Sequence, residues 1–159
     1  MVDLARCGRS VEQSYCAGSV PPDLQTVWDR LRDEGVEVEL LERPTGIEEG
    51  VDERLQARMR QTLESSMMPG IAVLLTGDGA GYEGGTGFRV ELEQMYNLGW
   101  GIEVLSWSAA CNHNLRDWAT EVGAFVSLED YFESVTFIHG GRKPKPLNMK
   151  RRKTAKPRR

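Results

Sequence analysis

The sequence predicts an α/β fold, a three-layer α/β/α sandwich with a mostly parallel sheet. Two observations predict it. Strand-like and helix-like segments alternate along residues 1–138, and this alternation is typical of parallel sheets whose strands are joined by helices. In addition, residues 71–76 form an almost wholly apolar run, as expected for a strand buried on both faces of such a sheet.

The N-terminal half predicts two strand–helix pairs. An early strand at 9–17 precedes a helix over 23–34, whose apolar residues fall on one face and which ends at Gly35. Residues 36–41 alternate between apolar and polar types, as a half-buried strand does. From Val51 onward, apolar residues recur every four positions until a Pro-Gly pair, which predicts a second amphipathic helix.

The C-terminal half continues the alternation after the strand at 71–76. A helix begins near Phe88 and ends at Gly99, and it is followed by a strand at 102–107. A helix over 112–122 and a short strand at 125–128 complete the series. We therefore expect one domain over residues 1–138.

Composition places the chain among intracellular globular proteins. Of its 159 residues 40% are hydrophobic, and no apolar run approaches the roughly 18 residues that cross a bilayer. The N-terminus lacks the pattern of a secretory signal. Its three cysteines are odd in number and far apart, which argues against a disulfide framework. We expect no membrane association and a location in the cytoplasm or nucleus.

Charge divides the chain into two parts. All 24 acidic residues and ten of the 20 basic ones lie within 1–138, giving this body a net charge of −14, and the other ten basic residues give 139–159 a charge of +10. The basic part also contains three prolines and little to bury, so we expect a disordered tail. Its cluster Lys150, Arg151, Arg152 and Lys153 is suited to RNA or DNA backbone and to nuclear targeting. A merely solubilising tail is the alternative.

The loop after residue 76 contains the pattern G-x-G-x-x-G between a strand and a helix, from Gly79 to Gly84. A dinucleotide site has this pattern, but there it belongs to the first strand–helix turn of the unit. Here two strand–helix pairs come first. Asp78 would also place a negative charge beside the pyrophosphate. The sequence therefore favours a role for Asp78 over a phosphate cradle.

Asp78 follows a strand expected to lie in a parallel sheet, and functional crevices form at the carboxyl ends of such strands. Glu49 and Asp52 flank the start of the preceding helix. Clustered carboxylates suit Mg²⁺ or Mn²⁺, which assist hydrolysis of phosphodiesters. The alternatives are an Asx-turn for Asp78 and a favourable interaction with the helix dipole for the other two.

Several of these residues together resemble the NYN domain, a branch of the PIN-like nuclease superfamily, over about residues 10–138. The resemblance is carried by these stretches: Glu49-Gly-Val-Asp52, Val73-Leu-Leu-Thr-Gly-Asp-Gly79, Gly87-Phe88, Gly99-Trp100, Ile102-Glu-Val104 and Trp107. It implies a Rossmann-like α/β/α sandwich of the PIN-like kind and a metal-dependent endoribonuclease that hydrolyses RNA phosphodiesters with bound Mg²⁺ or Mn²⁺. Asp52 and Asp78 resemble its catalytic metal ligands, and Glu49 and Glu83 are supporting candidates.

Two departures from the family pattern lower the expected activity. Many relatives carry a second aspartate two residues after the one that corresponds to Asp78, and this chain has Ala80 at that position. The family also begins with an apolar strand that ends in an aspartate, and only eight residues precede the strand at 9–17 here. We therefore expect weak or no cleavage. A non-catalytic RNA-binding or adaptor domain of the same fold is the alternative function.

A few other polar residues bear on the binding of RNA or metal. Ser106 and Ser108 flank Trp107 at a strand end and are candidates for phosphate contacts, although Ser108 or Asn112 also suits the cap of the next helix. Cys111 and His113 lack a second ligand pair, so zinc is disfavoured. RNA, single-stranded or structured, is the expected partner; a homo-oligomer is compatible with the sequence, and other protein partners are not indicated.

Overall fold

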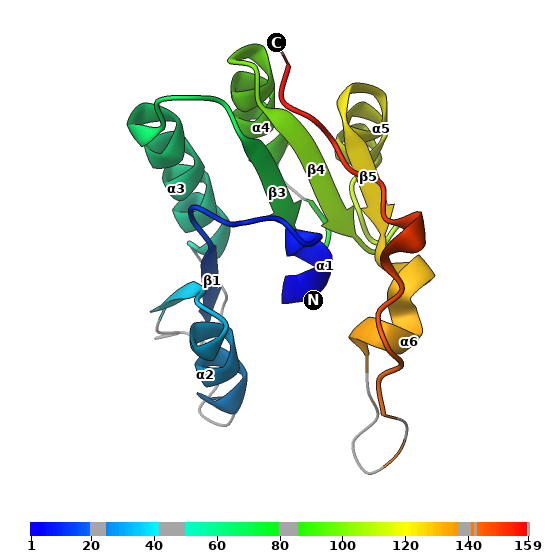
Figure 1. Cartoon of the computed structure of the whole chain (residues 1–159). Coiled ribbons are helices and arrows are strands. Elements are labelled where there is room, and N and C mark those ends of the chain that lie inside the picture. The colour runs from blue at the N-terminus through cyan, green and yellow to red at the C-terminus, as the bar shows by residue number, and fades with distance from the viewer. Residues whose placement is uncertain (20–24, 42–49, 80–85, 137–140, 142, 159) are drawn as a thin grey trace. The chain divides into compact units, whose positions relative to one another are not determined.

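A computed structural model describes residues 1–19, 25–41, 50–79, 86–136, 141 and 143–158. They fall into two compact units, one comprising 9–66 and the other 3–8 with 67–158. Parallel strands alternate with helices in both units, as Figure 1 shows, so the predicted α/β fold is confirmed. No helix in the described part of the chain is long and apolar enough to cross a membrane.

The unit over residues 9–66 contains a parallel pair of strands. Strands β1 (Tyr15–Ser19) and β2 (Glu37–Leu41) pair in register along their whole length. The accompanying helices are α2 (Gln25–Asp33) and α3 (Val51–Ser65). The strand predicted at 9–17 begins only at Tyr15, because residues 10–13 are exposed and pair with no strand.

The other unit is built on a three-stranded parallel sheet. Its strands are β3 (Ile71–Leu75), β4 (Gly101–Ser106) and β5 (Ala124–Ser127), in the order β3-β4-β5. All six residues of β4 are buried, whereas β3 lies at the sheet edge and is mostly half-buried. The apolar run at 71–76 is therefore not the most buried strand, because the central position belongs to β4.

Helices α4 (Phe88–Asn97) and α5 (His113–Val122) cover one face of this sheet (Figure 1). Both contact β4, and α5 also contacts β5. Gly123, which follows α5, passes so close to β4 that an added Cβ would lie 2.1 Å from the Ile102 carbonyl oxygen. Because that obstacle is backbone, only glycine fits there, and the turn from α5 into β5 depends on it.

The opposite face is covered by short elements and the end of the chain (Figure 1). These elements are α1 (Val2–Arg6), the 3-10 helix η1 (Leu128–Tyr131), α6 (Phe132–Val135) and the 3-10 helix η2 (Met149–Arg151). Their apolar side chains form a core with the sheet that contains Leu4, Leu105, Val126, Leu128 and Tyr131, with Leu147 and Met149 packed against it.

Residues 143–158, hereafter the C-terminal segment, lie along the sheet instead of forming the disordered tail expected from composition. Arg152 and Ala155 are buried, and the Arg158 amide donates to the Gly99 carbonyl at 2.8 Å. Gly101 permits this approach, since an added Cβ would lie 2.8 Å from the Lys156 carbonyl group. The physical reason is Glu103, a carboxylate in the middle of buried β4 that requires a cation.

Candidate functional site

The loop that carries Asp78 is fixed through its backbone. The buried Ser106 hydroxyl, at the end of β4, donates to the Gly77 carbonyl at 2.7 Å. The backbone amide of Asn112 donates to the backbone carbonyl of Asp78 at 2.5 Å. The Asp78 side chain itself is exposed. Hydrogen bonds from two later parts of the chain thus hold an exposed carboxylate at the carboxyl end of the sheet.

Gly79 directly follows Asp78, and two structural features require a glycine at this position. Its φ of +62° is in the left-handed region, and an added Cβ would lie 2.7 Å from Leu115 Cδ2 of α5. The Gly79 amide donates to Thr76 Oγ1 at 3.1 Å, so this N–H is already used within the loop. The glycine serves the turn and the packing of α5, which agrees with the preference against a phosphate cradle. Residues 80–85 lie outside the described part.

Ser106 and Ser108 have different surroundings. Ser106 is fully buried and also contacts the buried Cys111 thiol. Burial, the largest influence, raises the pKa of Cys111, and the Ser106 hydrogen bond opposes it. Ser108 is half-buried, and its amide donates to Glu129 at 3.0 Å. Ser106 therefore holds the Asp78 loop. Asn112, and not Ser108, caps α5, since its side chain accepts from the Asn114 and Leu115 amides.

Glu129 is an acid at this edge of the sheet that the sequence analysis missed. Its carboxylate accepts from the Ser127 hydroxyl at 2.6 Å and from the Ser108 and Ala109 amides at 3.0 and 3.2 Å. Burial raises its pKa, but these hydrogen bonds together outweigh burial and lower the pKa from 4.5 to about 2. An ionised Glu129 therefore links the loop after β4 to the end of β5.

Glu91 is a second acid that the sequence analysis missed. It lies in the first turn of α4 and is only 5% exposed. A carboxylate there is favoured by the helix N-terminus. The sequence already indicated that Glu91 is buried, because it stands three residues after Phe88 and four before Met95, within the apolar face of the helix.

Asp52 lies in the first turn of α3, half-buried, after the N-cap Gly50 with φ of +84°. It belongs to the unit over 9–66, whereas Asp78 belongs to the other unit, so their pairing stays a prediction. Glu49 and Glu83 lie outside the described residues. Within the parts of the chain that the structure describes, no three His, Cys, Asp or Glu side chains are grouped as a metal site.

The four cations predicted to contact nucleic acid separate into two kinds. Arg152 is buried and forms an ion pair with Glu103, with 2.7 Å between Nη2 and Oε2. Lys150, Arg151 and Lys153 are exposed. Arg152 is therefore a structural residue, and the three exposed cations are available to a ligand.

Comparison with known proteins adds no family to these observations. No protein-family model, no curated protein and no solved structure matches the chain. What the structure shows is an α/β fold in which parallel strands alternate with helices and an exposed aspartate is fixed at the carboxyl end of β3.

Proposed function

We propose that this chain is a metal-dependent endoribonuclease-like domain of the NYN type, with weak activity. The observation that carries the proposal is the position of Asp78 in a parallel sheet. It follows β3, its carbonyl is held by the Asn112 amide, and its carboxylate is exposed. Ligands of open parallel sheets bind outside the carboxyl ends of the strands, which is where a phosphodiester would meet this carboxylate.

The donor chemistry fits the metal that the NYN resemblance implies. Mg²⁺ and Mn²⁺ take carboxylate oxygens as ligands, and the resemblance assigns this role to Asp78 and Asp52. When bound, such an ion would lower the pKa of a water ligand and offset phosphodiester charge. Two carboxylates are few for Mg²⁺, which sheds its water reluctantly, and this is the reason for proposing weak activity.

The alternative function is a non-catalytic RNA-binding or adaptor domain. It is favoured by the exposed cations of the C-terminal segment, Lys150, Arg151 and Lys153, because an acidic body would otherwise repel RNA. Both functions share binding to RNA, and they differ in whether Asp78 contributes to cleavage.

Cleavage of labelled single-stranded RNA in Mn²⁺ tests the proposal. Asp78→Asn should lower the cleavage rate at least about tenfold, since even partners outside the ligand shell change metal-dependent activity by this much. Asp117→Asn is the matched control, because Asp117 is an exposed acid of α5 in the same unit, and it should cleave like the wild type.

Asp52→Asn tests the second assigned ligand and should also lower cleavage. Equal cleavage by the wild type, Asp78→Asn and Asp117→Asn would show that the activity comes from a contaminant, and the nuclease proposal would then be wrong. RNA binding without any Mn²⁺-dependent cleavage would support the non-catalytic alternative.

A further inference from the structure

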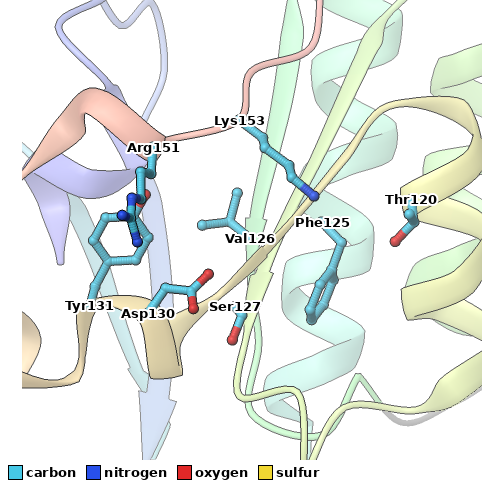
Figure 2. Close-up of a pocket in the computed structure, with 8 residues that line it drawn as sticks. All are labelled: Thr120, Phe125, Val126, Ser127, Asp130, Tyr131, Arg151 and Lys153. Carbon is cyan, nitrogen blue, oxygen red and sulfur yellow. The ribbon is translucent and has the colours of Figure 1, made fainter.

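A small cavity lies between β5, η1 and the C-terminal segment (Figure 2). Its volume is about 130 Å³. The cations Arg151 and Lys153 line it together with Phe125, Ser127, Asp130 and Tyr131, and in Figure 2 Arg151 lies beside Tyr131 and Asp130. In Figure 2 the Lys153 side chain extends across β5 toward Phe125. All these residues belong to one unit, so the cavity does not depend on the placement of the other.

The buried Arg152 stands between the two cations of the cavity in the sequence. Arg152 has an extended backbone conformation, and its side chain is held inward by Glu103. Its neighbours Arg151, the last residue of η2, and Lys153 are both exposed, and both line the cavity.

The cations of this cavity are available to a ligand. Arg151 and Lys153 are exposed, and neither forms an ion pair with another residue in the described ranges. Asp130 is the one acid among the lining residues, so the cavity has a net charge of +1. On a chain whose residues 1–138 carry −14, this makes it a local attractor for anions.

Size and lining limit the anion that fits. A volume of 130 Å³ is well below the roughly 300 Å³ at which pockets for drug-sized ligands begin. It is several times the space that one water molecule needs, which suits a single phosphate group. The half-buried Phe125 offers an aromatic surface beside it, and cations combined with aromatic rings are typical of single-stranded nucleic-acid sites.

We propose that this cavity binds one backbone phosphate of single-stranded RNA between Arg151 and Lys153, with the adjoining base or ribose against Phe125. The inference rests on the proposed interaction with RNA. It is independent of whether the chain cleaves the strand, because none of these residues is an assigned metal ligand.

Fluorescence anisotropy of a labelled 12-nucleotide RNA, measured in EDTA over a salt series, tests the cavity. The double variant Arg151→Gln/Lys153→Gln should weaken binding about tenfold at low salt. It should also reduce the slope of log K against log salt by about 0.7, the value for one phosphate of a single strand. Both residues are exposed, so the fold should be retained, which circular dichroism would verify.

Lys143→Gln/Lys156→Gln is the matched control, because it removes two exposed charges from the same segment outside the cavity. It should change affinity less than about threefold, a limit that follows from the small energies of exposed charges. Asp130→Asn gives a result of opposite sign: removing the acid of the cavity should strengthen RNA binding by about twofold.

The outcomes separate the cavity from the catalytic proposal. Three results would contradict the proposed phosphate site. They are equal weakening of RNA binding by the two double variants, unchanged RNA binding by the cavity variant, and no RNA binding by the wild type. The first two of these results leave Mn²⁺-dependent cleavage through Asp78 untouched. Cavity-dependent binding without cleavage would support the cavity and contradict the nuclease.

Discussion

Arg152 Nη2 lies 2.7 Å from Glu103 Oε2, and neither side chain has any exposed surface. The second oxygen of Glu103 accepts from the Ala155 amide at 2.8 Å. Arg152 also donates through Nε to the Leu4 carbonyl at 3.0 Å. One buried carboxylate and one guanidinium therefore join the central strand β4 to both α1 and the C-terminal segment.

Removing the cation alone should be costly. Arg152→Met leaves Glu103 charged and buried, and we expect a loss of about 3–5 kcal/mol in the free energy of unfolding. Adding Glu103→Leu removes the unpaired buried charge and should recover part of this loss. The recovery should be incomplete, because the Ala155 amide loses its acceptor. Equilibrium denaturation measures both. Arg151→Met is the control and should change stability by less than about 0.5 kcal/mol; equal effects at 151 and 152 would contradict the buried pair.

Hydrogen exchange should distinguish a packed C-terminal segment from a disordered tail. The Ala155 and Arg158 amides donate to Glu103 and to the Gly99 carbonyl, so we expect them to exchange slowly. The flanking Lys156, an exposed residue, provides the comparison and should exchange faster. NMR-detected exchange measures each amide, and uniformly fast exchange over residues 150–158 would contradict the packing.

The two glycines beside Asp78 should respond differently to alanine. Gly79→Ala meets Leu115 at 2.7 Å and keeps a positive φ, so we expect a loss of about 1–3 kcal/mol. Gly77→Ala meets nothing within 4 Å and should be tolerated. Thermal unfolding compares them. If Mn²⁺-dependent cleavage is present, Gly79→Ala should also lower it, because the Asp78 backbone would be displaced.

Glu129 should make stability depend on pH in acid solution. Its folded pKa of about 2 is below the ordinary 4.5, so the unfolded chain binds more protons between these values. The stabilisation is therefore complete above pH 4.5 and is lost as the pH falls toward 2. Glu129→Gln should flatten the curve of melting temperature against pH in this window. Glu121→Gln, which removes an exposed acid of α5, should flatten it less.

Periodicity predicted the longer helices and the strands after them, because amphipathic patterns over ten or more residues are strong signals. It did not predict α1. This helix has five residues and buries only Leu4, too little for a pattern. Its position depends on Arg152, which is 148 residues away in the sequence. Local sequence carries no information about such a contact.

The candidate site was predictable where it depended on a strand end. Asp78 follows β3 as expected, since a glycine-rich break after an apolar run is a local signal. The role of Glu129 was not predictable, because two of its three hydrogen bonds come from the Ser108 and Ala109 amides, which are far from it in the sequence. The order of the C-terminal segment was hidden by its average composition, although an acid inside the buried strand at 102–107 was a sign that a cation would be buried with it.

The link between Leu4 and Arg152 has a consequence for the order of events during synthesis. The unit over 9–66 contains both of its strands and both of its helices by residue 66, so all of these elements are synthesised before the other unit is complete. The unit that carries Asp78 lacks a partner for Glu103 until Arg152 emerges. Because domains generally fold as units during translation, we expect its buried carboxylate to delay closure of this unit until Arg152 has been synthesised.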